Sequence, residues 1–594
     1  MSFEKISKKS AEEKESSLLE WPKETEELII SEPKLRYINK ILELLRPEEN
    51  NEGEKMRWTE IYKNVKSYEN VVDLSDNINE VVRDWIAKKI PSLKNNIPFL
   101  RDIDDKNILS ALLDGEFEEI GKEVMGSRRE VLFAVAASVT KRIENCAYQK
   151  ILKEADDIHL QKLYLTPSTR DLLIELLDTS VKANPLFVRF LAYAQLSGRP
   201  LKKASAVTLY MPGDKRPHTI AEFFPHESQS LAKRFSSIAE HPQEWVTLPG
   251  GNIFKAYMEQ LSKLYNEKNP AQAEKHQEAA ASLFNNLLES DFPIILTLST
   301  EGYYKEPYYD PELKISLATP DTKKEEVDFK KTQKAMADSL EVLGVKKFQK
   351  NIQNSNIRVA HTIGAYGVNL VFNAVAQEKP EPTILMYLNL HMRSDEEKFP
   401  SDLALIKNIK EEFGDQTDIQ KENYIEKMPR YMTILHELAH NVYPDNSKEA
   451  KRLGRRPLTV IDEVKAEIIH KALVPHIIEK GGVPGTKRQW SYALLAGSLP
   501  WLKEPKRSPY YAATVYFLNG LFNRDTIRFY GGMFEIKDFE AYEKTVQSLA
   551  KEVLALYEDK NMTEKKAERW IIKRCTPNAE VEKISPALQA KTKR

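Results

Sequence analysis

Cysteine is almost absent from this chain. Among 594 residues only Cys146 and Cys575 are cysteines, and they lie far apart. Two isolated thiols supply neither a disulfide framework nor a cysteine-based metal site. We therefore expect a reducing compartment such as the cytoplasm.

Long apolar runs are missing as well. The most apolar stretches, such as Phe292–Leu298, are much shorter than the roughly 20 residues that cross a bilayer. Charged residues are interspersed through residues 1–21, which leaves no apolar stretch of about 7–15 residues typical of a secretory signal. We expect neither a membrane span nor a signal peptide.

Neither sign of charge is in excess. The chain has 88 lysines and arginines against 89 aspartates and glutamates, a formal net charge of -1. This balance argues against a surface that binds a polyanion over its whole extent, so nucleic acid is not an expected partner. The apolar share of 41% and the charged share of 30% are typical of a globular chain with much exposed helix.

The length predicts two to four domains or lobes. Apolar residues recur at helical spacing over residues 1–160, where no chemistry is evident. Residues 161–355 continue as helices but include two β-branched runs, 206–211 and 294–299, which predict a small sheet. Residues 356–594 have a third strand-like run, 383–389, and are otherwise helical, with a long amphipathic stretch at about 538–560. We predict a mostly helical α+β fold.

The informative motif is His436-Glu437-Leu-Ala-His440, which lies between Pro429 and Pro444. A proline fits the first turn of a helix and another can follow its end, so the motif is expected on one helix. A spacing of four residues then puts both imidazoles on one face, where they can bind one zinc ion, and Glu437 is placed to act on a metal-bound water.

A third ligand is expected on a second amphipathic helix that starts near Thr459. Glu463 and Glu467 lie four residues apart on one face of that helix. Glu463 as ligand would leave the fourth zinc position open, as in catalytic sites. Glu467 and Asp462 would then accept hydrogen bonds from the histidine rings. The alternative is an exposed helix whose glutamates face solvent.

These residues resemble a known family. The motif at 436–440 followed by Asp462-Glu-Val-Lys-Ala-Glu467 is similar to the paired signatures of the dipeptidyl peptidase III family of zinc metallopeptidases and their bacterial relatives. In that family the second acidic residue of the downstream motif is a zinc ligand, which maps onto Glu463. The resemblance implies two lobes with a cleft and a single zinc ion in the helical lobe, within residues 356–594.

Three further positions follow from the resemblance. The segment with Glu301 and Tyr303, followed by Asp310-Pro311, is similar to the family's Glu-x-Tyr segment, and the segment with Asn369 is similar to an asparagine-containing strand of the family. The resemblance implies that Tyr303 stabilises the oxyanion with zinc and that Glu301 and Asn369 bind the substrate's free ammonium group.

The chain also departs from the family. The peptidases commonly have a six-residue His-Glu-x-x-x-His motif, whereas this motif has five residues. Their later catalytic histidine has no counterpart, because Ser508–Thr514 occupies that place, with Tyr510 and Tyr511 as possible substitutes. No ligand spacing links His361, His391, His470 or His476 to the motif, and His470 is expected on a polar helix face.

The sequence therefore predicts a zinc-dependent peptidase that releases dipeptides from the free N-terminus of oligopeptides. Glu437 would take a proton from the water and return it to the leaving amine. Two alternatives stay open at this point. One is a zinc endopeptidase that acts on a specific protein, and the other is an inactive member that uses the cleft to bind peptides or a protein.

Overall fold

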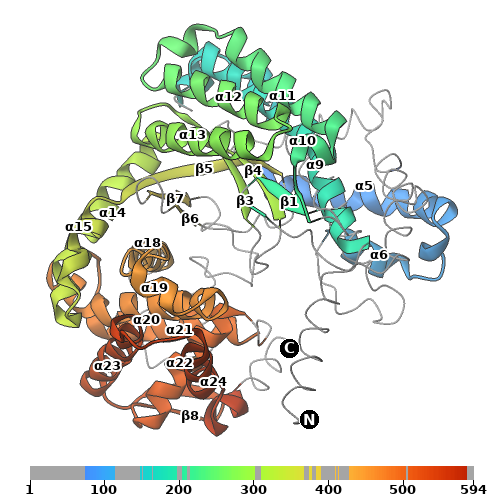
Figure 1. Ribbon diagram of the computed structural model, residues 1–594. Helices are drawn as coiled ribbons and strands as arrows, with labels where there is room; N and C mark the ends of the chain where they lie inside the picture. Colours follow the sequence, from blue (N-terminus) through green and yellow to red (C-terminus); the bar gives the residue numbers. More distant parts are fainter. Residues whose placement is uncertain are drawn as a thin grey trace, which may run out of the picture. The chain divides into compact units, whose positions relative to one another are not determined.

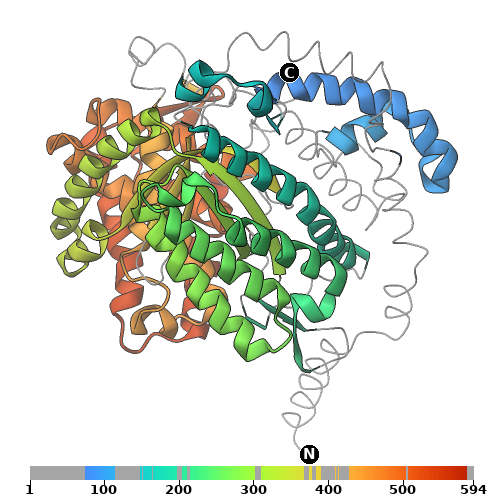
Figure 2. The same cartoon turned by 90° about the horizontal axis from the view of Figure 1, so that it is seen from above.

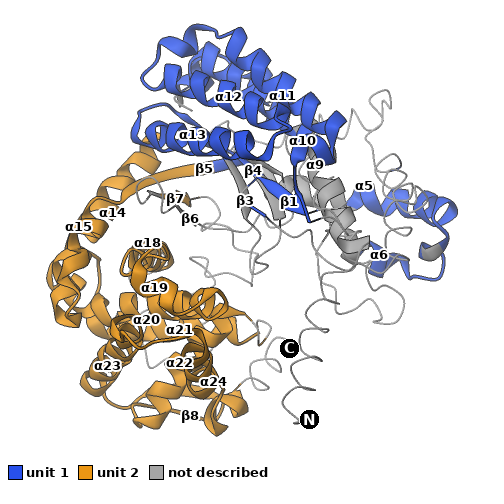
Figure 3. Cartoon of the chain, viewed as in Figure 1, with its two compact units in different colours: residues 1–318, 362–370 blue, residues 319–361, 371–594 orange. Residues whose placement is uncertain are grey.

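The computed structural model describes residues 74–113, 148–149, 151–162, 165–196, 204–205, 207–210, 215–301, 309–366, 374–377, 383–388, 427–503 and 508–584, together with a few single residues. The fold is α+β and mostly helical, as predicted (Figure 1). The chain divides into two compact units (Figure 3): unit 1 comprises residues 1–318 and 362–370, and unit 2 comprises residues 319–361 and 371–594. The predicted regions 1–160, 161–355 and 356–594 stay a prediction, as does a cleft.

Unit 1 is built mainly from helices. They are α5 (Leu74–Asn96), α6 (Asp105–Leu113), α8 (Asp157–Lys162), α9 (Pro167–Leu196), α10 (Ile220–Phe223), α11 (Pro225–Glu240), α12 (Gly251–Asn266) and α13 (Pro270–Glu289). Helices α11, α12 and α13 pack side by side (Figure 2). The start of α13 shows how sequence sets a boundary: Asn269 accepts hydrogen bonds from two backbone amides, and Pro270 needs no such acceptor.

Within the described residues the strands form three sheets. The largest has the order β3-β4-β5-β7-β6, with β3 (Ile294–Glu301), β4 (Tyr309–Leu317), β5 (Asn356–Tyr366), β6 (Ala374–Gln377) and β7 (Thr383–Tyr387). β3 pairs with β4 and β6 with β7 in antiparallel fashion, whereas β5 and β7 are parallel. Two hairpins complete the set: β1 (Thr208–Tyr210) with β2 (Pro217–Thr219), and β8 (Ile527–Tyr530) with β9 (Met533–Ile536).

Unit 2 has one large hydrophobic core. Its helices are α14 (Pro320–Ser339), α15 (Gln349–Gln353), α18 (Met428–His440), α19 (Lys448–Arg452), α20 (Arg455–Glu479), α21 (Lys487–Ser498), α22 (Pro509–Asn523), α23 (Phe539–Glu558) and α24 (Glu564–Arg574). The core draws side chains from most of these helices and from β5 and β7. α20 lies at its centre, in contact with α14, α18, α22, α23 and α24.

The burial of α20 corrects one expectation. The helix is not an amphipathic surface helix, because buried residues occur all round it, including the charged residues Asp462, Lys465 and Lys471. A helix covered on every side must pair each buried charge, since an unpaired charge in the interior is very costly. The carboxylates of Asp462, Glu463 and Glu467 therefore do not simply face solvent.

The other sequence-based elements fall into two groups. The three predicted strands correspond to β1, β3 and β7, and the long amphipathic stretch is α23, which Asp538 caps. The strands β2, β4, β5 and β6 and the β8–β9 hairpin were not predicted. None of the helices within the described ranges combines the length and apolarity needed to span a bilayer.

Candidate metal centre

Helix α18 places the two motif histidines on one face. It starts at Met428, with Pro429 in its first turn, and ends at His440. The predicted helix is therefore present. The rings of His436 and His440 lie with their centroids 4.9 Å apart, and their two Nε2 atoms are separated by 3.2 Å. His436 is buried and His440 is partly buried, so their nitrogens meet at the inner side of the helix.

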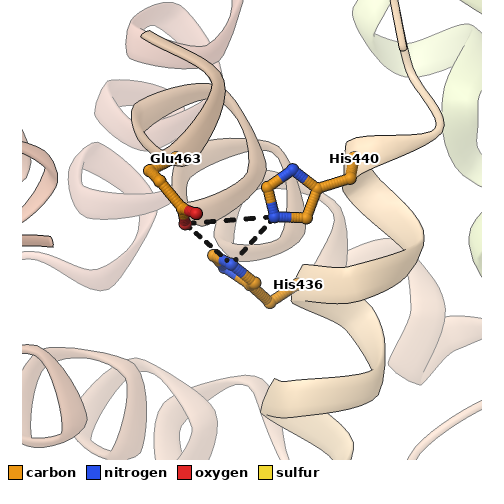
Figure 4. Close-up of side chains that lie close together, drawn as sticks. All are labelled: His436, His440 and Glu463. Atoms are coloured by element: carbon orange, nitrogen blue, oxygen red, sulfur yellow. Dashed lines mark hydrogen bonds and ion pairs between the residues drawn. The ribbon is translucent and has the colours of Figure 1, made fainter. Parts of the chain in front are cut away.

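Glu463 reaches the same point from α20. Its Oε2 lies 3.2 Å from Nε2 of His436 and 3.9 Å from Nε2 of His440 (Figure 4). The oxygen is buried and forms no hydrogen bond. Three potential ligand atoms from two helices therefore converge, and all lie within 4.8 Å of one another.

This triangle fits a zinc ion. Zinc binds histidine nitrogen and carboxylate oxygen at about 2.0–2.2 Å, so neighbouring ligand atoms of a tetrahedral site stand about 3.3 Å apart. Two of the three separations are 3.2 Å and the third is 3.9 Å. Two imidazoles and one carboxylate would leave a fourth position free for water or substrate.

Each imidazole donates a hydrogen bond from its Nδ1 to a carboxylate of α20. Nδ1 of His436 donates to Oε2 of Glu467 at 3.1 Å, and Nδ1 of His440 donates to Oδ2 of Asp462 at 2.5 Å. Because carboxylates accept only, these bonds place the proton on Nδ1 and direct the lone pair of Nε2 toward Glu463. Such partners fix the orientation of a ring that binds a metal.

The cluster attracts positive charge. Burial alone lowers the pKa of the His436 imidazole, but Glu463 and Glu467 outweigh it and raise that pKa well above its usual value. For Asp462, burial raises the pKa, whereas Lys465 and His440 lower it, and the net shift is downward. The site thus keeps ionised carboxylates next to nitrogens that bind either protons or a cation.

Glu437 lies beside this triangle. Its carboxylate forms no hydrogen bond or ion pair with the described part of the chain. Burial raises its pKa, and the nearby imidazoles reduce that rise. A carboxylate with a raised pKa is a better proton acceptor near neutral pH than an ordinary glutamate.

A second group of potential ligands shares His436. It consists of His436, Glu467 and His470, and it corrects the expectation for His470, which is buried and not on a polar face. The sequence signal was the three-residue spacing of Glu467 and His470. Lys471 forms an ion pair with Glu467, and Nδ1 of His470 donates to the Ala466 carbonyl. A cation beside the lysine would be repelled, so the triangle with Glu463 is the better metal site.

Tyr510 and Tyr511, at the start of α22, have different surroundings. The ring of Tyr510 lies 6.1 Å from that of His436 and stacks on Trp501 at 4.6 Å. Tyr511 is buried in the core of unit 2. Of the two candidates for the place of the family's later histidine, only Tyr510 contacts a residue of the candidate site among the contacts found in the described ranges.

The remaining predicted site residues are not described in full. Tyr303 and Asn369 lie outside the described residues. Glu301 ends β3, where it pairs with Tyr309 across a register shift, and only its backbone is described. The predicted roles of these three residues stay predictions.

The fold is like that of dipeptidyl-peptidase III structures. The structure of dipeptidyl-peptidase III from Corallococcus sp. strain EGB matches with a TM-score of 0.50 and 15% identity over 65% of this chain and 71% of that chain. The structure of DPP III from Caldithrix abyssi matches with a TM-score of 0.51 and 14% identity over 82% and 92%. At these identities the likeness concerns the fold alone.

No model of a known protein family matches the sequence, and no curated protein matches it either.

Proposed function

We propose that this protein is a zinc-dependent peptidase that releases dipeptides from the free N-terminus of oligopeptides. The observation that carries the proposal is the convergence of His436, His440 and Glu463 with Glu437 beside them. Two further observations support the proposal. The fold is similar to that of dipeptidyl-peptidase III structures. The motifs that resemble this family contain the same three residues, His436, His440 and Glu463.

The metal would be held by Nε2 of His436, Nε2 of His440 and Oε2 of Glu463. A zinc ion bound there would act as a Lewis acid on the scissile carbonyl and lower the pKa of a water to about 7. Asp462 and Glu467 keep the two imidazoles in the tautomer that presents Nε2.

Glu437 moves the proton. Its carboxylate takes a proton from the attacking water and passes it to the nitrogen of the leaving amine, which otherwise departs as a poor leaving group. The pKa raised by burial suits both steps, because the group must accept a proton and then give it up near neutral pH.

The specificity part of the proposal rests on the resemblance. Glu301 and Asn369 are proposed to bind the ammonium group of the peptide, and Tyr303 is proposed to donate a hydrogen bond to the oxyanion. A buried carboxylate gains from an ammonium partner and is left unpaired without it. The substrate should therefore need a free N-terminus.

The test is product analysis by mass spectrometry on a matched pair of peptides of about six residues, one with a free and one with an acetylated N-terminus. Release of dipeptides from the free peptide alone supports the proposal. Equal internal cleavage of both indicates an endopeptidase, and zinc binding without cleavage of either indicates a peptide-binding protein. Glu437→Gln, prepared in parallel, controls for contaminating peptidases.

A further inference from the structure

Two buried lysines pair with the carboxylates that accept hydrogen bonds from the histidines of the candidate metal centre. Lys465 and Lys471 are both on α20, with exposed fractions of 0% and 4%. A buried ammonium group is costly unless a carboxylate pairs with it, so each lysine should have a specific partner. Lys465 pairs with Asp462, three residues earlier, and Lys471 pairs with Glu467, four residues earlier. Both spacings put the partners on one face of the helix.

The two carboxylates use their oxygens in the same way. Oδ2 of Asp462 accepts from His440, and its Oδ1 accepts from Lys465. Oε2 of Glu467 accepts from His436, and its Oε1 accepts from Lys471. Each carboxylate therefore bridges one imidazole and one lysine, and with both oxygens engaged it cannot rotate without breaking a charge-assisted hydrogen bond.

Lys465 makes two further contacts. Its Nζ donates to the backbone carbonyls of His440 at 3.3 Å and Tyr443 at 3.1 Å. Both carbonyls belong to the end of α18 and the turn after it, where Tyr443 has a φ of 54° that non-glycine residues rarely adopt. Lys465 thus ties the C-terminal end of the histidine helix to the glutamate helix, in addition to holding Asp462.

Lys471 acts on one partner. Its Nζ is engaged by Glu467 and lies 5.2 Å from the centre of the Phe517 ring. Loss of this ammonium group would leave the Glu467 carboxylate, whose side chain is only 14% exposed, with one unpaired oxygen. The effect should reach His436, the other partner of that carboxylate.

The lysines also set the charge of the centre. Glu437, Asp462, Glu463 and Glu467 contribute four negative charges, and the two lysines reduce the formal charge to -2 when the histidines are neutral. A divalent cation balances that charge.

We propose that Lys465 and Lys471 are positioning residues of the metal centre, which fix the imidazoles of His440 and His436 through Asp462 and Glu467. This inference rests on the proposed zinc site but not on peptidase activity. Neither lysine contacts the three ligand atoms: Lys471 acts through Glu467, and Lys465 acts through Asp462 and through the backbone carbonyls of His440 and Tyr443.

The experiment measures zinc affinity by competition with a chromogenic chelator, for Lys471→Met, Lys465→Met and the exposed control Lys480→Met, which directly follows the same helix. Loss of a partner behind a metal ligand typically weakens metal binding about 10–100-fold. We expect that loss for Lys471→Met and Lys465→Met, and wild-type affinity for Lys480→Met. The visible spectrum of the cobalt-substituted protein should change with the first two only.

A double-mutant cycle tests whether the lysine acts through its carboxylate. Glu467→Gln combined with Lys471→Met should weaken zinc binding no more than Glu467→Gln alone. If Lys465→Met alone does not fold, the double variant Asp462→Asn with Lys465→Met, in which both partners of the ion pair are uncharged, is compared with Asp462→Asn alone. Additive losses would overturn the coupling.

Other outcomes are equally decisive. A folded Lys471→Met protein with wild-type or tighter zinc affinity would overturn the positioning role, even if its melting temperature falls, because a purely structural lysine changes stability alone. A wild-type protein that binds no zinc would overturn both this inference and the proposed function. Zinc binding that depends on the lysines, without peptidase activity, would overturn only the proposed function.

Discussion

Nδ1 of His440 and Oδ2 of Asp462 lie 2.5 Å apart, although 22 residues separate them in the chain. The bond joins the end of α18 to the first half of α20, the two helices that hold all three potential zinc ligands. It fixes the ring of His440, and the second oxygen of Asp462 is engaged by Lys465. The geometry of the site therefore depends on a residue that would not touch the metal.

The first prediction concerns this bond. Asp462→Asn should weaken zinc binding by about 10–100-fold, because an amide is a poorer acceptor than a carboxylate for the imidazole N–H. Chelator competition measures the effect. Glu479→Gln, which changes an exposed carboxylate near the end of the same helix, is the matched control and should bind zinc like the wild type. Equal affinities for the two variants would mean that Asp462 does not support the site.

A second prediction addresses proton transfer. Glu437→Gln should retain zinc and fold but lose at least about 10²-fold in kcat, the lower end of the range for general acid–base catalysis. The amide keeps the shape of the side chain and cannot accept the proton. Steady-state kinetics on a dipeptidyl-arylamide, together with zinc analysis, separates the roles. A variant within a few-fold of wild type would remove Glu437 as the base.

The third prediction is a dependence of stability on pH. Asp321 on α14 accepts a hydrogen bond from His361 on β5 at 2.9 Å, and this bond lowers the pKa of the aspartate from 3.8 to about 2, against a smaller opposing effect of burial. A depressed pKa in the folded state stabilises the protein above the unfolded value, and the contribution is lost as pH falls from about 4 toward 2.

Asp321→Asn should therefore lower the free energy of unfolding at pH 7, and the difference from wild type should shrink below pH 4. Because the carboxylate is 64% exposed, solvent screens the pair and the difference should stay below about 1 kcal/mol. Urea unfolding of the two metal-free proteins at pH 7, 5 and 3 gives the values. A difference that grows as pH falls would contradict the assignment.

The fourth prediction concerns the start of α20. Gly454 has a φ of 79°, and an added Cβ would come within 2.5 Å of the Glu564 side chain. Gly481, just after the same helix, also has a positive φ of 68° but has open space around it. Gly454→Ala should destabilise the protein by more than Gly481→Ala, since both have the backbone cost of about 1 kcal/mol or more and only the first has the steric clash. Equal losses in urea unfolding would show that Glu564 moves aside freely.

Sequence spacing was sufficient for the parts of the site that follow helical periodicity. The spacing of four residues puts His436 and His440 on one face of α18, and α20 brings Glu463 to them. The spacing did not predict which side chains of α20 are buried. The sequence around Asp462 and Lys465 has the charge of a surface helix, and only the packing of α14, α18, α22 and α23 around α20 makes it interior.

Several of the strands that were not predicted do have a signal in the sequence. β4 contains Leu313-Lys-Ile-Ser-Leu317 and β5 begins Asn356-Ile-Arg-Val, so both strands alternate polar and apolar residues, a pattern typical of a half-buried strand that the prediction did not use. The β8–β9 hairpin had a clearer signal, because Gly531 and Gly532 both adopt the positive φ of a tight turn. The segments around Tyr303 and Asn369 carry no periodic signal, and their roles depend on the resemblance.

The most direct measurement is the zinc content of the purified protein by elemental analysis, for the wild type, His440→Ala and His476→Ala. His476 lies on the same helix as Glu463 but outside both ligand groups, so it controls for a general loss of histidine. We expect one zinc per chain in the wild type and in His476→Ala, and none in His440→Ala. A wild type without zinc after zinc loading, or full occupancy in His440→Ala, would contradict the proposed metal centre.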